Sequence, residues 1–297
     1  MSSTRRYDLL RSRLDRFTRT LPGVESGEIG AVHRVRVASR RLRELLPVLE
    51  IEQAVARKLG RRLRKLTRRL GSVRDLDVLI FLVEELREHG RLPDRALRRV
   101  DGAVHQERDE ARGGLSLRSV AADLKRVSRK LEAIAAELET ADRPRSPAWR
   151  WALDARVLRR ASTLKAAIEE AGAVYLPERL HRVRLALKKL RYGVELAVET
   201  AGLKDSSDLV TLRHGQELLG RLQDLQVLIE RVRRVQASLM PPDLGAWREL
   251  DALVTALENT CRRLHARYVR DRAALILLSE RLAARTSSGR SFARRAG

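Results

Sequence analysis

Two copies of one sequence pattern occur along the chain, and this internal repeat limits the folds that the chain can adopt. Residues 33–43 match residues 181–191, and residues 70–80 match residues 219–229, in the same order and at nearly the same spacing. Two blocks that recur in order indicate a duplicated structural unit rather than chance similarity.

The repeat gives a simple prediction for the domain organisation. We expect one domain over residues 1–286, made of two repeats at about 1–142 and 148–286. The seam between the repeats is the stretch 142–147, which contains two prolines. The segment 287–297 is basic and rich in small residues, and we expect it to form a mobile tail.

The composition and the apolar pattern favour helices throughout. Ala, Leu, Arg and Glu are abundant, and all four are good helix formers. Apolar residues recur at spacings of three and four, and the alternation typical of strands is missing. Breaks such as Gly90–Pro93 and Gly113–Gly114 divide the pattern. The sequence therefore predicts an all-α protein with about ten helices.

The net charge indicates the kind of ligand. The chain of 297 residues has 62 Lys and Arg against 39 Asp and Glu, which gives a formal net charge of +23. Self-repulsion of this size opposes a compact state unless an anion supplies counter-charge. Most of the basic residues are Arg, which makes bidentate contacts with phosphate. A GC-rich genome would explain the high ratio of Arg to Lys equally well, but it does not explain the excess of positive charge. We expect a polyanionic ligand.

The first repeated block reads as a helix with two opposite faces. On a wheel of about 100° per residue, Val35, Ala38, Leu42 and Leu45 fall on one side. The other side carries His33, Arg36, Arg40 and Arg43. The second copy repeats this division, with a polar stripe of His181, Arg184, Lys188 and Arg191.

A second basic segment follows in the first half only. Residues 57–69 hold eight basic residues and no acidic one. Like charges four apart weaken an isolated helix by about 0.2–0.5 kcal/mol per pair, and ordinary solvated faces mix both signs. We therefore assign this segment a ligand-binding role. The matching segment 208–219 keeps only Arg213 and His214 as basic candidates, so we expect the first half to carry more of the ligand.

Metal binding and catalysis find little support in the residues. Cys261 is the only cysteine, which excludes an intrachain disulfide and a thiolate zinc site. His33 and His181 share their faces with Arg, which repels cations, so we expect a neutral imidazole that donates one hydrogen bond. Asp75 and Asp77 are two apart on a helix and cannot converge on a metal; we expect Asp75 to orient an arginine or to cap a helix. We predict no metal and no cofactor.

The repeated blocks resemble the CHAD family, the conserved histidine α-helical domain. The pattern of that family is matched by residues 32–43 (V-H-R-V-R-V-A-S-R-R-L-R) and 70–78 (L-G-S-V-R-D-L-D-V). In the second half it is matched by residues 180–192 (L-H-R-V-R-L-A-L-K-K-L-R-Y) and 219–227 (L-G-R-L-Q-D-L-Q-V). The match extends over the whole chain in the expected order.

The resemblance implies a fold and a ligand that composition alone does not give. CHAD domains are all-helical, with two pseudo-symmetric helical bundles around a basic central cavity or groove, and they bind inorganic polyphosphate. The residues that this similarity, together with the basic segment above, assigns to polyphosphate are His33, Arg36, Arg40, Arg43, Lys58, Arg61, Arg62, Lys65, Arg68, Arg69, His181, Arg184, Lys188, Lys189, Arg191, Tyr192, Arg213 and His214.

The resemblance also bears on activity and location. Many relatives are fused to a triphosphate-tunnel enzyme with an E-x-E-x-K motif, which this sequence lacks, so we expect a binding protein and not an enzyme. The chief alternative is a nonspecific nucleic-acid-binding protein, although an aromatic content of 3% argues against base stacking. No apolar run reaches the roughly 20 residues of a membrane span, so we expect a cytoplasmic protein that does not bind membranes. Some relatives occur at polyphosphate granules, which makes granule association a further expectation.

Overall fold

The computed structural model describes residues 6–141, 148–201, 207–240 and 243–295, and side chains only as far as residue 284. Within these residues there are helices and connecting segments but no strand, so the predicted all-α class is confirmed. The α-helices are α1 (Arg6–Thr18), α2 (Leu21–Glu25), α3 (Ile29–Leu45), α4 (Gln53–Arg69), α5 (Gly71–Glu88), α6 (Asp94–Gly113), α7 (Leu117–Ala141), α8 (Ala148–Ala171), α9 (Pro177–Thr200), α10 (Ser207–Ala237) and α11 (Leu244–Arg295). A short 3₁₀ helix, η1 (Leu46–Val48), follows α3.

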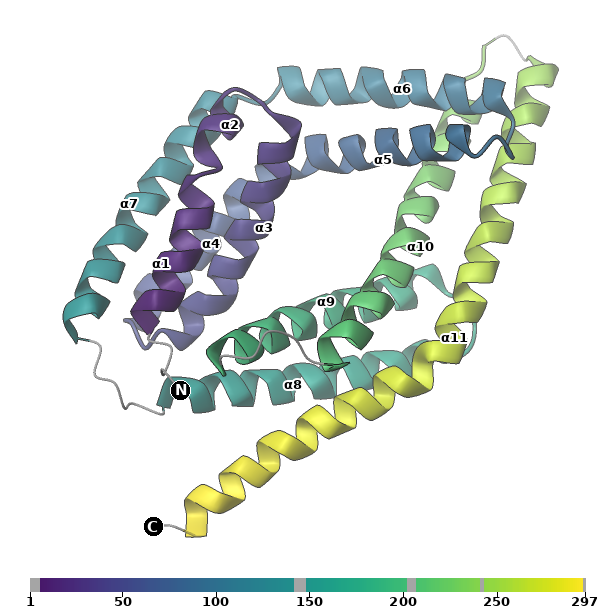
Figure 1. Cartoon of the computed structure of the whole chain (residues 1–297). Coiled ribbons are helices and arrows are strands. Elements are labelled where there is room, and N and C mark those ends of the chain that lie inside the picture. The colour runs from purple at the N-terminus through teal and green to yellow at the C-terminus, as the bar shows by residue number, and fades with distance from the viewer. Residues whose placement is uncertain (1–5, 142–147, 202–206, 241–242, 296–297) are drawn as a thin grey trace.

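The helices form a frame with four sides (Figure 1). α1 to α4 and α7 make one side, and the antiparallel pair α5 and α6 leaves it to make the next. The pair α10 and α11 forms the third side, and α8 and α9 form the fourth. Contacts close the frame at two joints, where α5 and α6 meet α10 and α11, and where α3 and η1 meet α8 and α9.

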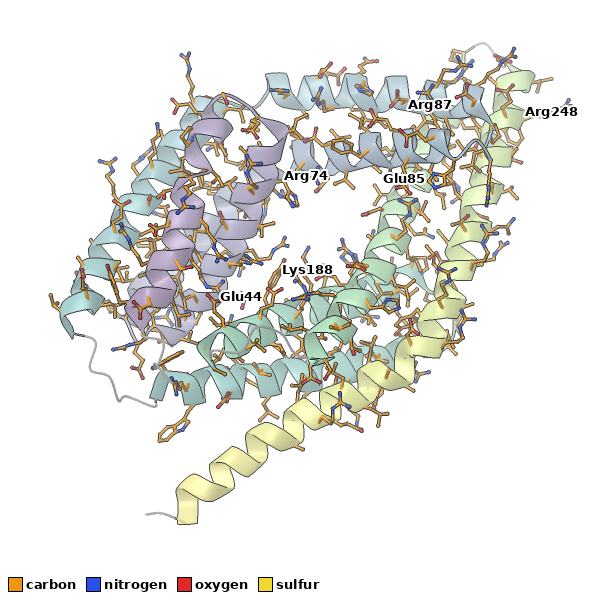
Figure 2. All side chains as sticks on the ribbon, in the orientation of Figure 1. Glu44, Arg74, Glu85, Arg87, Lys188 and Arg248 are labelled. Carbon is orange, nitrogen blue, oxygen red and sulfur yellow. The ribbon has the colours of Figure 1, made fainter. Side chains whose placement is uncertain are left out.

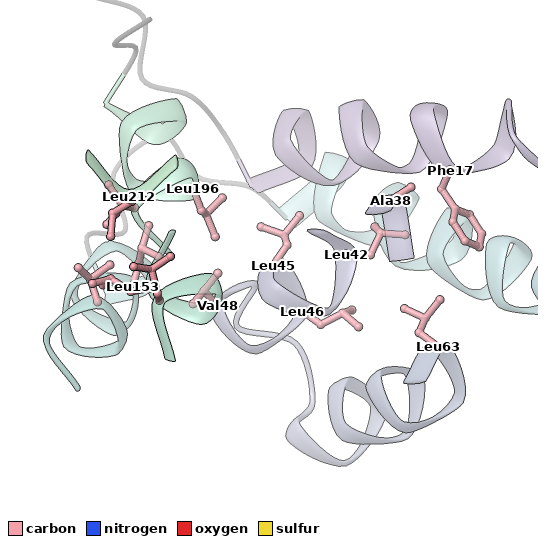
Figure 3. Packing of buried hydrophobic residues seen from close by; sticks show 14 of the residues in the cluster. Phe17, Ala38, Leu42, Leu45, Leu46, Val48, Leu63, Leu153, Leu196 and Leu212 are labelled. Carbon is pink, nitrogen blue, oxygen red and sulfur yellow. The ribbon is translucent and has the colours of Figure 1, made fainter. Parts of the chain in front are cut away.

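Two apolar clusters hold the frame together. The larger cluster joins the first side to α8 and α9, and Figure 3 shows Leu45 and Val48 of the first half packed beside Leu153 and Leu196 of the second. The smaller cluster joins α5 and α6 to α10 and α11. Each fully buried leucine contributes roughly 1.5–3 kcal/mol of hydrophobic free energy. Both clusters contain helices from each half of the sequence, so the core is shared between the halves.

The repeated blocks occupy comparable helices but differ in one respect. The His-containing blocks lie in α3 and α9, and the Leu-Gly blocks lie in α5 and α10. In the first half the chain ends α4 at Arg69 and begins α5 at Gly71. In the second half α10 runs through Leu219 and Gly220 without a break.

The structure bears on some of the predicted boundaries between segments and not on others. The seam at 142–147 lies outside the described residues, and the division into repeats at about 1–142 and 148–286 stays a prediction. Gly90 has a positive φ of 62° and separates α5 from α6, as its position in the sequence indicated. The tail predicted from residue 287 begins inside α11, whose backbone is helical to Arg295.

Candidate functional site: a central cluster of cations

The polar face of α3 is fixed by the burial of its apolar face. Val35, Leu42 and Leu45 have no exposed surface, because they pack into the larger apolar cluster. The opposite face then points toward α4 and α5, where Arg36, Arg40 and Arg43 line a cavity of about 380 Å³. α4 contributes Arg64, Thr67 and Arg68 to the same cavity, and the start of α5 contributes Gly71, Ser72 and Asp75.

Arg36 is held in place by two acceptors. Its Nη1 donates to the backbone oxygen of Thr67 at 2.9 Å, and its Nη2 lies 3.5 Å from Asp75 Oδ1. Burial lowers the pKa of Arg36, and the charge of Asp75 partly opposes this. Of the two roles predicted for Asp75, the contact supports the orientation of an arginine, since α5 has no side-chain cap.

His33 is neutral in this setting. Arg74 Nε donates to His33 Nδ1 at 3.2 Å, so the ring proton of the neutral imidazole resides on Nε2. Burial lowers the pKa of His33, and Arg74 and Arg36 lower it further. An extra positive charge on this ring is therefore opposed by its neighbours, and Nε2 of His33 is left as the hydrogen-bond donor; its contact with a ligand stays a prediction.

The stripe on α9 faces the stripe on α3. Burial lowers the pKa of Lys188 to about 7, and the charges of Arg40, Arg184, Arg36 and Arg191 lower it too. Two of these arginines belong to α3 and two to α9. Figure 2 shows Lys188 on α9 and Arg74 on α5 pointing from different sides toward the space that the frame encloses. The fold thus brings the cations of both repeats together.

Tyr192 links the two stripes directly. Its hydroxyl oxygen accepts a hydrogen bond from Arg40 Nη1 at 2.9 Å. The guanidinium carbons of Arg40 and Arg191 lie 5.5 Å and 4.6 Å from the centre of the tyrosine ring, within the range of cation–π attraction. The ring is 6% exposed, so it supports the arginines and offers no free face to a ligand.

Other predicted residues of α9 have partners of their own. Arg191 donates to Gln216 Oε1 at 2.8 Å and to Glu195, which neutralises its charge. His181 Nδ1 lies 2.6 Å from Gln223 Oε1, and because an amide oxygen only accepts, Nδ1 is the donor. Lys189 is exposed beside half-buried Lys188.

The basic residues of α4 divide into two stripes about 100° apart on the helix. Arg64 and Arg68 face the cavity, with Arg61 on the same side. The second stripe contains Lys58, Arg62, Lys65 and Arg69. Arg69 lies 3.3 Å from Asp123 of α7, so this stripe is turned away from the cavity. The sequence reasoning missed Arg64, whose signal was its spacing of four from Arg68.

Arg213 and His214 do not extend the cluster in the same way. His214 Nε2 lies 3.2 Å from Asp271 Oδ2 of α11. Together with Arg267 and Arg270 it lines a separate cavity of about 460 Å³ between α10 and α11. Arg213 is exposed on the preceding position of α10. Arg213 and His214 therefore do not play, in the second half, the part that Arg64 and Arg68 play in the first.

We name the resulting set the central basic site and define it by seven cations: Arg36, Arg40, Arg43, Arg64, Arg68, Arg184 and Lys188. Asp75 lines it, and the half-buried Asp224 feels the charges of Arg184 and Lys188. Burial raises the pKa of Asp224, and the charge of Asp75 raises it further. The Nε of Arg184 is buried and has no hydrogen-bond partner among the described residues. The site is thus rich in donors that are not saturated by the protein.

The described residues contain no group of three or more His, Cys, Asp and Glu side chains placed to hold a metal ion. Among the described helices, none combines the length and apolar character that a membrane crossing requires.

Fold and site together define an all-helical protein that gathers arginines from α3, α4 and α9 into one cluster. The family model of the CHAD domain matches residues 8–233, and the chain therefore belongs to the CHAD domain family, as its repeated blocks indicated.

Solved structures agree with this fold. The chain is similar to the crystal structure of the CHAD domain from the plant Ricinus communis, with 21% identity, a TM-score of 0.59, and coverage of 92% of this chain and 90% of that one. It is also similar to PptA from Streptomyces chartreusis, with 15% identity, a TM-score of 0.60, and coverage of 95% and 98%. A comparison with proteins of curated function gives no match.

Proposed function

We propose that this chain binds inorganic polyphosphate at the central basic site and does not turn it over. The observation that carries the proposal is the meeting of the α3 and α9 stripes around Lys188, where four arginines act on one half-buried lysine. Such a concentration of like charge is unfavourable in the free protein and is relieved by an anion with many charges. Inorganic polyphosphate, the ligand that the resemblance to the CHAD family implies, is such an anion with many charges.

The geometry suits a chain of phosphates rather than single bases. Arginine forks and a lysine can each contact non-bridging oxygens, and release of counterions then drives association. Recognition of single-stranded nucleic acid relies on aromatic platforms. Tyr192 is the aromatic residue in contact with this cluster, and its ring is covered by Arg40 and Arg191. We therefore favour polyphosphate over nucleic acid.

Competition at matched salt and matched total charge tests this preference. Calorimetric titration with polyphosphates of graded length should give affinity that rises with length until the site is filled, and that falls steeply with salt. Duplex and single-stranded DNA of equal charge should compete poorly. Displacement of bound polyphosphate by DNA would instead favour the nucleic-acid alternative.

The two stripes of α4 provide a matched pair of variants. Arg64→Ala/Arg68→Ala removes two charges that line the cavity, and Arg62→Ala/Lys65→Ala removes two charges from the stripe that faces away. We expect the first pair to weaken binding by about tenfold or more and to reduce the salt slope by about two. The second pair should act only through screened long-range charge, with a loss of about threefold or less. Equal losses would contradict the assignment of the cavity.

The absence of turnover is a separate part of the proposal. Incubation with long polyphosphate and Mg²⁺ should release no phosphate above the rate of a protein-free control. Steady release by the purified chain, lost in the Arg64→Ala/Arg68→Ala variant, would show an enzyme at this site. If the proposal holds, a tagged chain in cells should gather at polyphosphate granules, and depletion of cellular polyphosphate should disperse it.

A further inference from the structure

Lys188 differs from an ordinary surface lysine in its surroundings. It is half-buried on α9, and its side chain points into the space that the frame encloses (Figure 2). Arg36 and Arg40 of α3, which line the cavity of the central basic site, are close enough for their charges to act on it. Arg184 lies one turn before it on its own helix. The charge of Lys188 also lowers the pKa of Asp224 on α10, yet burial and the arginines dominate, and the pKa of Lys188 falls to about 7. No hydrogen bond from its ammonium to another described residue stabilises the charged form.

A lysine of this kind combines two properties that are rarely found together. About half of its amino groups are neutral at pH 7, and only the neutral amine is nucleophilic. The arginines around it meanwhile bind phosphate oxygens. A small molecule that carries a phosphate as leaving group would be bound by the arginines with its electrophilic atom close to the lysine.

We propose that Lys188 is an acylation site for small acyl phosphates. The Nζ lone pair attacks the acyl carbon and forms an amide N–C bond, while the C–O bond to phosphate breaks. Inorganic phosphate leaves with the bonding electron pair and is stabilised by the arginines, and the proton of the amine passes to the released phosphate or to water. The inference rests on the proposed function, because it needs the central basic site to bind phosphate oxygens.

Acylation at this position would act on the same site. The amide is uncharged, so one of the seven cations is lost, and the acyl group occupies space between the α3 and α9 arginines. Both effects weaken the binding of a polyanion. The inference therefore gives the proposed polyphosphate-binding function a means of down-regulation by the supply of acyl phosphates.

Lys189 is an internal control in the same peptide. It is adjacent in sequence but exposed, and it points about 100° away around the helix. Compared with a lysine of ordinary pKa 10.5, Lys188 has roughly 1,600 times more neutral amine at pH 7. If nucleophilicity falls with basicity by a Brønsted slope near 0.5, as it does for thiols, on the order of a 30-fold rate advantage remains.

The test uses the full chain, acetyl phosphate and mass spectrometry with fragmentation that separates the two lysines. We expect Lys188 to be acetylated at least about thirtyfold faster than Lys189 at pH 7, with a rate that levels off above about pH 8. The thirtyfold advantage arises from the amine alone and therefore applies to a neutral reagent, the N-hydroxysuccinimide ester of acetic acid; acetyl phosphate should exceed it, because the arginines bind its phosphate. Equal rates at the two lysines with acetyl phosphate would overturn the inference, and so would equal selectivity with both reagents.

Polyphosphate added before the reagent separates this inference from the proposed function. Protection of Lys188 by long polyphosphate, together with weaker polyphosphate binding by the acetylated chain, supports both. Selective acetylation of Lys188 in a chain that does not bind polyphosphate would refute the proposed function and leave the acylation site standing. Tight polyphosphate binding without selectivity for Lys188 would refute the acylation site alone.

Discussion

Polyphosphate binding at the central basic site should be coupled to the uptake of a proton by Lys188. In the free protein the pKa of this lysine is about 7, mainly because of burial and then because of Arg40 and Arg184. A bound polyanion supplies the missing counter-charge and favours the ammonium form. The bound state then holds more protons than the free state between about pH 7 and the ordinary value of 10.5. Affinity is therefore highest below pH 7 and falls as the pH rises through this window.

The size of the effect follows from the two pKa values. If the bound lysine regains a pKa near 10.5, linkage gives a loss of affinity of about 50-fold between pH 7 and pH 9, which is about 2.3 kcal/mol. At pH 8 about 0.9 proton is taken up per site occupied. The pKa of His33 is lowered in the free protein by burial and by Arg74, and a bound polyanion that raises it adds proton uptake of the same sign. Burial also raises the pKa of Asp224 in the same cluster, so a variant at position 188 is needed to isolate the lysine.

Calorimetry in two buffers of different ionisation enthalpy measures this uptake directly. The slope of observed enthalpy against buffer enthalpy at pH 8 should be close to one proton for the natural chain. Lys188→Arg keeps a permanent charge at the position, so its proton uptake should fall to the small remainder from other groups, and its affinity should change little from pH 7 to pH 9. A natural chain with no proton uptake, or an arginine variant with undiminished uptake, would refute the role assigned to Lys188.

Three further predictions concern stability and the support of the site. Glu44→Ala should destabilise the fold by about 3 kcal/mol in urea denaturation. Glu44 is 13% exposed and pairs with Arg156 and Arg160, and both arginines would be left partly buried without a counter-charge. A loss below 1 kcal/mol would mean that the joint between α3 and α8 depends on apolar contacts alone. Tyr192→Phe should cost about 1 kcal/mol of stability through the lost hydrogen bond with Arg40, while polyphosphate affinity falls less than in Arg40→Ala, because the ring beneath the guanidinium remains. Without a polyanion the melting temperature should rise when NaCl is increased from about 20 to 200 mM. Saturating polyphosphate should remove most of that rise, since salt and polyphosphate relieve the same repulsion between cations. A melting temperature that falls with salt would contradict the assumed repulsion.

The orientation of α3 and α9 could be predicted from the sequence because it depends on each helix alone. An apolar stripe with helical period must face the core. The opposite, polar stripe must then lie on a surface of the frame, either outer or inner. His33, Arg36 and Arg40 on α3 lie as the wheel predicted, and so do Arg184 and Lys188 on α9. That the two stripes would meet was implied by the family resemblance and not by either pattern.

The arrangement of α4 could not be predicted in the same way. Its apolar stripe fixes only the inward direction, and the polar half of the helix spans a wide arc. Which part of that arc faces the cavity depends on where α7 packs, and Asp123 of α7 pairs with Arg69. The sequence reasoning therefore grouped Lys58 and Lys65 with Arg68, although the structure turns them about 60–80° away from it around the helix.

The Leu-Gly blocks show a similar limit. Gly71 and Gly220 occupy equivalent places in the two repeats, but only the first marks a break between helices. A Cβ atom at residue 71 would lie 3.1 Å from Arg36 Nη1, whereas one at residue 220 would meet nothing within 4 Å. The glycine at 71 thus allows α5 to begin close to an arginine of the site. This requirement comes from a neighbour that is 35 positions away, so local sequence does not reveal it.

The distribution of the carboxylates explains how a chain of net charge +23 can fold around such a site. Ion pairs join the two halves at both joints of the frame. Glu85 of α5 and Glu107 of α6 pair with Arg221 and Arg231 of α10, and Glu44 of α3 pairs with arginines of α8. The same two joints contain the apolar clusters, which supply most of the free energy of folding. Carboxylates at the joints neutralise arginines there, whereas Arg43, Arg64 and Arg68 line the cavity of the central basic site without an ion pair to a described carboxylate. Arg36 and Arg40 also support the fold through their hydrogen bonds, but Arg64 and Arg68 line the cavity without a carboxylate partner among the described residues. Loss of Arg64 and Arg68 should therefore weaken polyphosphate binding and leave the fold as stable as before, or more so at low salt.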